Sequence, residues 1–296
     1  MPKMPIVDAH VHLWDPQRFR IPWLDGDTLL ERPFGLADYR EQTAGLAITA
    51  FVYVQVEVAP AYGLSEARTV AALAAEDPRL KAIVAYAPLE DGHCVRAYLD
   101  DLVRLSPLIR GVRRITQGEA DPAFCLRPAF VEGVRQLADY DLSCDLCLYH
   151  TQLGPTVELV RHCPDVRFML DHIAKPGIRA GEIERWRTEL SALADLPNVW
   201  CKISGVVTEA DHSSWTSAQI SPYINHALAV FGEDRVLFGS DWPVVLKAAN
   251  YRRWVETLDE LTAGLSETAR AKLWATNAQR FYRTGGVEGF TSPQTN

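Results

Sequence analysis

The sequence predicts a single domain of the (β/α)8 barrel class, TIM-like but distorted, that spans residues 1–296. The length is suitable, because such barrels commonly need about 250 residues. Eight short segments rich in Val, Ile, Phe and Tyr alternate with amphipathic segments, which predicts parallel strands joined by helices. Several apolar segments end in His, Arg or Asp, and barrel enzymes carry their reactive groups at these strand ends.

The strands and helices follow from residue type, spacing and stop signals. Strands are expected at residues 6–12, 48–57, 82–89, 109–115, 143–150, 166–173, 199–205 and 236–243. Helices are expected where apolar residues recur three and four apart before Gly or Pro, at 64–76, 95–105, 127–139, 152–162, 182–195 and 222–231. Segments 251–261 and 268–282 are expected to be closing helices, and the tail after Arg283 to be loose.

Residues 13–36 interrupt this alternation. The segment contains Trp14, Phe19, Trp23 and Phe34 among several prolines and glycines. It follows the first predicted strand at the end where barrel active sites form, so we expect a long functional loop over the active-site face.

Composition excludes several classes of protein. The net charge is −8 and basic runs are missing, which argues against a nucleic-acid partner. No stretch of 18 apolar residues and no leading signal segment is present, so we expect a cytoplasmic protein without a membrane span. The six cysteines form no recognisable disulfide framework.

The strongest local signal is the pair His10 and His12 at the end of IVDAHVH. Residues two apart on a strand face the same side, so both imidazoles should point into the barrel mouth. Such a pair suits a divalent metal or two hydrogen bonds, although it also occurs in ordinary polar networks. The case for a functional site is stronger because His150, His172 and Asp241 also stand at predicted strand ends. We expect all five side chains to converge there.

Asp241 is the predicted base of this cluster. The segment VLFGSD places Gly239 and Asp241 on one face, with space left beside the glycine. A carboxylate beside imidazoles can bind a metal or accept a proton from water, whereas a purely structural Asp would only cap the next turn.

Cationic, polar and aromatic residues near the strand ends are candidates for substrate contact. One of Arg113 and Arg114 must face inward, and an inward cation needs an anion or a developing oxyanion as partner. Alternatively, the cationic residues form salt bridges at the barrel rim, and the aromatic residues pack within the long loop. The candidates are Arg113 as a catalytic residue, Lys202 within the seventh strand, and Trp14, Trp23, Gln55, Glu57, Arg114, Tyr149, Lys175 and Trp242 as substrate-binding residues.

The motifs DAHVHLWDP, FVYVQVE, IRGVRR, LDHIAKPG and LFGSDWP, in this order, resemble the amidohydrolase superfamily, over residues 8–282. Within it the chain is similar to the amidohydrolase 2 branch of sugar- and pyrone-lactone hydrolases, and to its L-fuconolactonase-like members. The resemblance implies a distorted barrel whose catalytic residues are His10, His12, His150, His172 and Asp241.

The resemblance also implies hydrolysis of a sugar lactone, L-fuconolactone or a related L-sugar lactone, in carbohydrate metabolism. Binuclear members carry a lysine on the fourth strand, which this chain lacks, so at most one divalent metal, zinc, is expected on His10, His12, His172 and Asp241, and the resemblance does not require it for activity. A metal-dependent non-oxidative decarboxylase is the alternative activity, and a non-catalytic barrel that binds a sugar acid is a further one.

Overall fold

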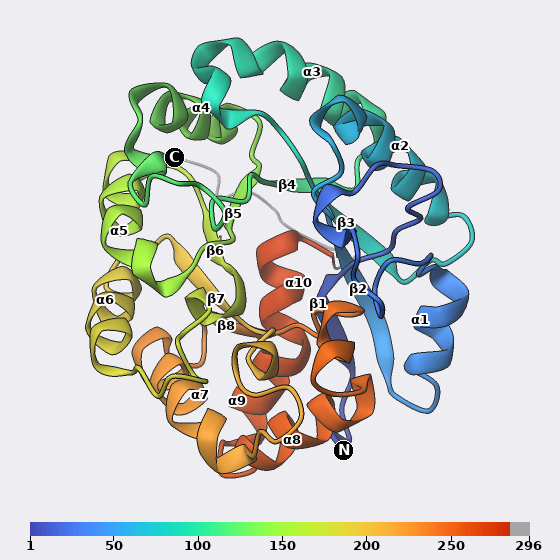
Figure 1. The fold of residues 1–296 in the computed structure, drawn as a ribbon, viewed down its shortest axis with the longest axis vertical. Coiled ribbons are helices and arrows are strands. Elements are labelled where there is room, and N and C mark those ends of the chain that lie inside the picture. Colours follow the sequence, from blue (N-terminus) through green and yellow to red (C-terminus); the bar gives the residue numbers. More distant parts are fainter. Residues whose placement is uncertain (285–296) are drawn as a thin grey trace, which may run out of the picture.

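The protein folds into a barrel of eight parallel strands surrounded by helices, as predicted (Figure 1). The structure is a computed structural model, and it describes residues 1–284; the tail prediction falls almost entirely outside them. The strands pair in sequence order from β1 to β8. Their bounds are β1 Ile6–Val11, β2 Ile48–Val54, β3 Leu80–Ala85, β4 Ile109–Arg113, β5 Ser143–Leu146, β6 Phe168–Leu170, β7 Val199–Ile203 and β8 Val236–Phe238.

Helices on the outside cover the strands through a continuous apolar layer. None of the helices in the described part of the chain is long and apolar enough to cross a membrane. Helix α1 had not been predicted, whereas the others match the amphipathic segments. Their bounds are α1 Leu36–Gln42, α2 Gly63–Leu73, α3 Val95–Leu105, α4 Pro128–Asp139, α5 Leu153–His162, α6 Glu184–Ala194, α7 Ser217–Phe231, α8 Tyr251–Leu261, α9 Glu267–Ala271 and α10 Asn277–Tyr282.

The barrel is distorted where its first and last strands meet. β1 and β8 share no regular ladder; one bridge joins Val11 to Trp242, beyond the end of β8. The π-helical segment η9 (Lys272–Thr276) and α10 contact both strands and occupy the seam. Apolar side chains of α10 pack with the inward residues of β1, β2 and β3 and close the bottom of the barrel, so α10 stands at the centre of Figure 1.

Several strands end earlier than predicted, and this shapes the opposite, open end. β5 stops at Leu146 and β6 at Leu170, where residues 150 and 173 had been expected. After β6 the backbone is left-handed at four consecutive residues, 172 to 175, with φ of 55°, 47°, 62° and 45°. Non-glycine residues rarely adopt this conformation, so an apolar sequence pattern cannot reveal the change of direction.

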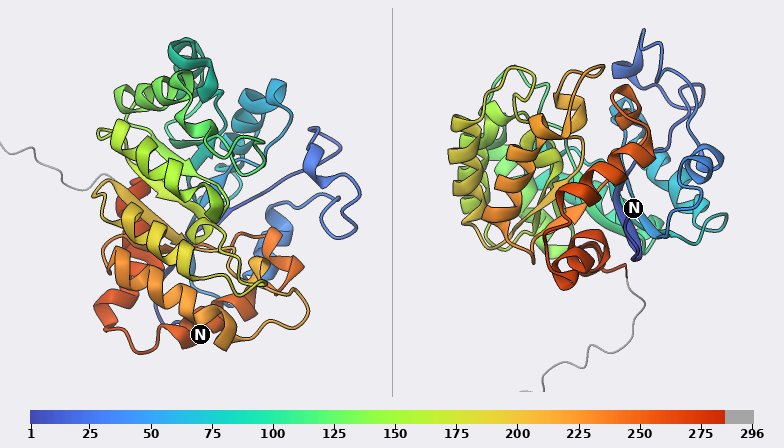
Figure 2. Two further views of the ribbon diagram at one scale, coloured as in Figure 1. Left: turned by 60° about the vertical axis from the view of Figure 1, so that its left-hand side comes forward. Right: turned by 90° about the horizontal axis from the view of Figure 1, so that it is seen from below.

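The segment 13–36 is a long loop on the active-site face, as predicted. It contains only one short 3-10 turn, η1 (Pro22–Leu24), and it projects beyond the barrel in both views of Figure 2. The Trp14 indole donates to the carbonyls of Leu30 (3.2 Å) and Arg32 (2.9 Å), and the Trp14 and Phe34 backbones pair. These bonds hold the loop against the mouth.

Candidate active site

A β-bulge in β1 directs both predicted histidines into the barrel. Asp8 lies opposite Phe51 of β2, and Val11 lies opposite Tyr53, so β1 contains one extra residue between the pairs. Ala9 packs inward and Asp8 binds the hydroxyls of Tyr39 and Tyr251 outside. Simple alternation would place His10 on the side of Asp8; the bulge turns it inward with His12.

His172 and Asp241 reach the same point from β6 and β8. The left-handed run after β6 carries His172 inward, and Gly205 leaves room for it: a Cβ there would lie 2.6 Å from His172 Nδ1. Gly239 likewise leaves room for His10, since a Cβ at position 239 would lie 2.8 Å from His10 Cβ. Gly239 and Asp241 thus lie on the same side of the chain, as predicted, although β8 ends at Phe238 rather than at residue 243 and Asp241 has a left-handed backbone with φ of 58°.

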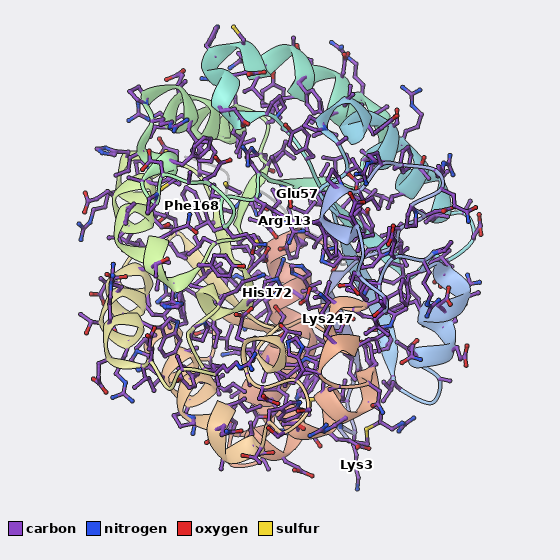
Figure 3. The ribbon with its side chains drawn as sticks, in the orientation of Figure 1. Lys3, Glu57, Arg113, Phe168, His172 and Lys247 are labelled. Atoms are coloured by element: carbon purple, nitrogen blue, oxygen red, sulfur yellow. The ribbon has the colours of Figure 1, made fainter. Side chains whose placement is uncertain are left out.

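The four side chains form one cluster. Asp241 Oδ1 lies 3.4 Å from His12 Nε2, 3.7 Å from His10 Nε2 and 3.8 Å from His172 Nε2. The two Nε2 atoms of His10 and His12 are 3.1 Å apart. All four residues are buried, and His172 lies with Arg113 and Glu57 around the centre of Figure 3.

A network of charged side chains lies beneath this cluster. Arg113 points inward, where its Nη1 donates to Asp171 Oδ2 (3.0 Å) and lies 3.2 Å from His10 Nε2. Lys202 Nζ lies 2.7 Å from Asp145 Oδ2, 2.9 Å from Asp171 Oδ1 and 3.4 Å from His10 Nδ1. The two cations and two carboxylates balance, so the fully buried network carries no net charge.

The hydrogen bonds set the tautomers of His10 and His12. His12 Nδ1 lies 2.7 Å from the Val54 carbonyl, which can only accept, so His12 Nε2 carries a lone pair. Arg113 can only donate to His10 Nε2, which leaves the Nδ1 proton of His10 facing Asp171 at 3.3 Å. Two lone pairs and the Asp241 carboxylate thus face one another.

This donor set fits a divalent cation. His10, His12 and Asp241 form one group of possible ligands, and His172 Nε2 lies beside it. Zinc bonds to nitrogen at about 2.0–2.1 Å with tetrahedral geometry, which puts donor atoms roughly 3.3 Å apart. The three donor atoms are separated by 3.1, 3.4 and 3.7 Å.

Burial keeps the imidazoles neutral. It lowers the pKa of His12 and, more strongly, of His10, and it lowers the pKa of His172 to about 4 against the opposing effect of Asp241. Burial would raise the pKa of Asp241, but the neighbouring imidazoles, His172 foremost, outweigh it and hold that pKa below its usual range. Asp241 is therefore an ionised acceptor among neutral imidazoles at neutral pH.

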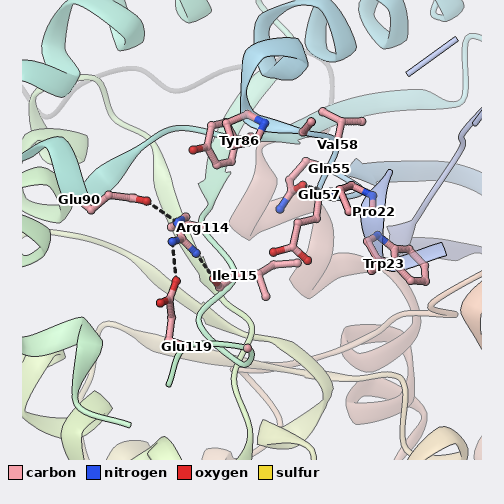
Figure 4. Close-up of a pocket in the computed structure, with 13 residues that line it drawn as sticks. Pro22, Trp23, Gln55, Glu57, Val58, Tyr86, Glu90, Arg114, Ile115 and Glu119 are labelled. Atoms are coloured by element: carbon pink, nitrogen blue, oxygen red, sulfur yellow. Dashed lines mark hydrogen bonds and ion pairs between the residues drawn. The ribbon is translucent and has the colours of Figure 1, made fainter. Parts of the chain in front are cut away.

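Two adjoining pockets open above the cluster. The inner pocket, about 140 Å³, reaches His12, His172, Asp241, Arg113 and Lys175. The outer pocket, about 390 Å³, contains Gln55, Arg114, Glu90 and Glu119 (Figure 4). Both are lined by Trp23, Glu57 and Ile115.

Six candidates line neither pocket: His10 and Lys202 are fully buried, and four others lie elsewhere. Because β5 ends early, His150 lies in the turn η5 (His150–Gln152), where it contacts the Lys175 carbonyl (2.8 Å) and Glu182 (3.5 Å) instead of the other histidines. Tyr149 is 41% exposed beside it. Trp14 is buried within the loop, and Trp242 is fully buried against Phe34 and Tyr39. The expected convergence of all five His and Asp side chains is thus corrected to four.

Several site residues were not predicted. Asp145 and Asp171 stand inside apolar strand ends, and a buried carboxylate facing Lys202 could have been inferred from the need of that cation for partners. Ser204, which lies 2.9 Å from His172 Nδ1, has no distinguishing pattern. Cys147 and Gln117 line the inner pocket and likewise carry no signal.

Comparisons with known proteins agree with this architecture. A family model described as amidohydrolase matches residues 7–284, nearly the whole described chain. The chain belongs to the amidohydrolase family. Its resemblance to that family, inferred from five motifs, is thereby confirmed.

Individual relatives of this amidohydrolase cover almost the whole chain. It is 32% identical over 295 residues to L-fucono-1,5-lactonase of Burkholderia multivorans, covering 93% of this chain and 95% of that one. It is 30% identical to L-fucono-1,5-lactonase of Burkholderia ambifaria, covering 96% and 97%. A crystal structure of an amidohydrolase from Burkholderia multivorans with bound Zn matches with a TM-score of 0.85 and 30% identity, covering 95% and 99%.

Proposed function

We propose that this amidohydrolase opens a sugar lactone to the free aldonic acid, with L-fuconolactone or a related L-sugar lactone as its substrate. The observation that carries the proposal is the buried Asp241 carboxylate at the floor of a pocket that Arg113 and Lys175 also line. The two relatives named L-fucono-1,5-lactonase support the choice of substrate class.

The reaction begins with Asp241 taking a proton from water while the water oxygen attacks the lactone carbonyl carbon. The tetrahedral intermediate places negative charge on the former carbonyl oxygen. The bond between the carbonyl carbon and the ring oxygen then breaks, and Asp241 returns its proton to the ring oxygen. The product is a hydroxy acid, which releases one proton to solvent at neutral pH.

Arg113 and Lys175 stabilise the developing oxyanion. Burial alone would lower the pKa of Lys175, but Cys147, Glu209 and Asp241 raise it overall, so its ammonium stays charged. Arg113 is held by Asp171 and the Gln55 carbonyl, while its Nε has no hydrogen-bond partner among residues 1–284. Cations fixed before the reaction need no reorganisation when the oxyanion forms.

His10, His12 and Asp241, with His172 beside them, are the residues that would hold a zinc ion. When bound, such an ion would polarise the carbonyl and lower the pKa of a nearby water. Thermal unfolding of chelator-treated protein tests this without an activity measurement. Added Zn²⁺ should raise the unfolding temperature, because a ligand that binds only the folded state stabilises it. His12→Asn should abolish that rise, and an equal rise in this variant would contradict the assignment.

A pH-indicator screen of L- and D-aldonolactones, in both ring sizes, tests the activity. We expect release of one proton per turnover. The variant Asp241→Asn keeps the side-chain shape but cannot accept a proton, so kcat should fall about 100-fold or more.

Asp101→Asn is the matched control, because Asp101 is an exposed residue paired with Arg104 on α3. It should leave kcat unchanged. Carbon dioxide release from an aromatic acid, with every lactone left intact, would instead identify a decarboxylase. Tight binding of an aldonic acid without any turnover would identify a binding protein.

A further inference from the structure

The outer pocket lies directly beside the proposed reaction centre and is larger than the inner pocket. Trp23, Glu57 and Ile115 line both, so a molecule seated at Asp241 can extend past these three side chains without leaving the protein. The outer pocket contains none of the histidines and not Asp241. It therefore holds none of the groups to which the proposed reaction assigns a chemical step.

Trp23 offers a fixed aromatic surface at the junction. Its indole is 39% exposed, yet Nε1 donates to the Val56 carbonyl at 2.7 Å. The Trp14 ring packs edge-on against it at 5.5 Å between centroids. Indoles held in this way bind the apolar face of a sugar ring at little cost in side-chain entropy.

Glu57 places an unpaired carboxylate at the same junction (Figure 4). Its backbone is left-handed, with φ of 57°, and its amide donates to the side chain of Gln55, which is fully buried. The Glu57 carboxylate has no hydrogen bond or ion pair within residues 1–284. A strained backbone that presents an unpartnered acceptor to a cavity is typical of a ligand contact.

The charged side chains that line the outer pocket favour the binding of a neutral, hydroxylated group. Arg114 donates to Glu90 at 2.9 Å and to Glu119 at 2.6 Å, so its charge is already neutralised (Figure 4). Glu90 lines the same pocket with a side chain that is 32% exposed, and its Oε1, besides accepting from Arg114, can accept from a hydroxyl. Anionic substituents would meet three carboxylates, those of Glu57, Glu90 and Glu119, against one guanidinium.

Building on the proposed lactone hydrolysis, we propose that the outer pocket is a subsite for a neutral glycosyl substituent, so that the preferred substrate is an aldonolactone carrying a second sugar. The substituent stacks on Trp23 and donates hydroxyl hydrogen bonds to Glu57 and Glu90. The lactone ring occupies the inner pocket, where its hydrolysis is unchanged.

The test compares matched substrates. The reference is the unsubstituted lactone that the enzyme opens fastest in the screen; the others carry one neutral hexosyl group, or one phosphate, at each ring hydroxyl in turn. At least one hexosyl lactone should show about tenfold higher kcat/KM, the gain expected from burying about 50 Å² of apolar sugar surface. The phosphorylated lactones should show no such gain.

Gly118→Phe probes the pocket itself. Gly118 lines the outer pocket and a Cβ there meets no atom within 4 Å, so an aromatic ring fits at the pocket wall without displacing the backbone. It should lower kcat/KM for the hexosyl lactone at least tenfold more than for the reference. Gly264→Phe, also in open space, is the matched control and should change neither value.

The outcomes separate this inference from the proposed function. If the reference lactone is opened but no hexosyl lactone is preferred, or if Gly118→Phe lowers both values equally, the subsite is refuted and the lactonase stands. A preference for a phosphorylated lactone also refutes it. If no lactone is opened at all, the proposed function fails and this inference fails with it. The substrate comparison needs only the unaltered protein.

Discussion

Arg113 and Arg114 are adjacent in the sequence but belong to different parts of the site. Arg113 closes β4 and faces the buried network, whereas Arg114 turns to the outer pocket and pairs with Glu90 and Glu119. Alternation along a strand requires opposite directions for the two but does not say which one faces inward. Only the register of β4 against β5, with Arg113 opposite Asp145, settles it.

Arg113→Lys should lower kcat about 100-fold, the cost of losing one donor to a developing oxyanion. The planar guanidinium holds Asp171, His10 and the Gln55 carbonyl together through two nitrogens, and a lysine ammonium cannot reproduce that fork. Steady-state kinetics on the best lactone provide the measurement. Arg110→Lys, near the other end of β4, should retain full activity. A kcat within threefold of the original for Arg113→Lys would remove this residue from the proposed mechanism.

At the scale of elements, the sequence predicts the repeated strands and helices but not the local irregularities in them. Apolar patterns located eight strands and their connecting helices except α1, because burial of one face imposes a regular spacing of apolar residues on both kinds of element. They did not locate the bulge in β1, the left-handed run after β6 or the early end of β5. Each depends on tertiary contacts rather than on local residue type. The position of His150 was mistaken for that reason, whereas His10, His12 and Asp241 were placed correctly.

Helix α2 is joined to β2 by a buried carboxyl group with a measurable pH effect. Glu66 accepts from the Val56 amide (2.8 Å) and the Tyr53 hydroxyl (2.7 Å), and burial raises its pKa to about 6. A folded pKa above the unfolded value means that the folded state retains this proton more strongly. The contribution is therefore complete below about pH 4.5 and is lost as pH rises through about 6, amounting to about 2 kcal/mol.

Glu66→Gln should remove this dependence. Urea unfolding at several pH values between 4.5 and 7.5 would give the difference in unfolding free energy between the original protein and the variant. That difference should change in favour of the variant by about 2 kcal/mol as pH rises, and level off above pH 7. A difference that stays constant with pH would show that Glu66 keeps an ordinary pKa.

At the scale of the whole molecule, the buried charges connect the closed bottom of the barrel to its reactive mouth. Lys202 on β7 bridges Asp145 of β5 and Asp171 beyond β6, and the Tyr282 hydroxyl of α10 donates to Asp145 at 2.6 Å. The same Asp171 faces His10 Nδ1. The helix that fills the seam between β1 and β8 is therefore linked through three side chains to the orientation of a proposed catalytic histidine.

Lys202→Met should destabilise the fold by about 3–5 kcal/mol, because it leaves the buried Asp145 carboxylate without its cation and removes one of the two cations that pair with Asp171. Urea unfolding followed by tryptophan fluorescence measures the loss, and Lys81→Met, exposed on β3, is the matched control. Adding Asp145→Asn to Lys202→Met removes the carboxylate charge that has lost its cation, so the double variant should regain part of the loss. If Lys202→Met costs less than about 1 kcal/mol, or if the two changes are simply additive, the network does not join the barrel in the way described.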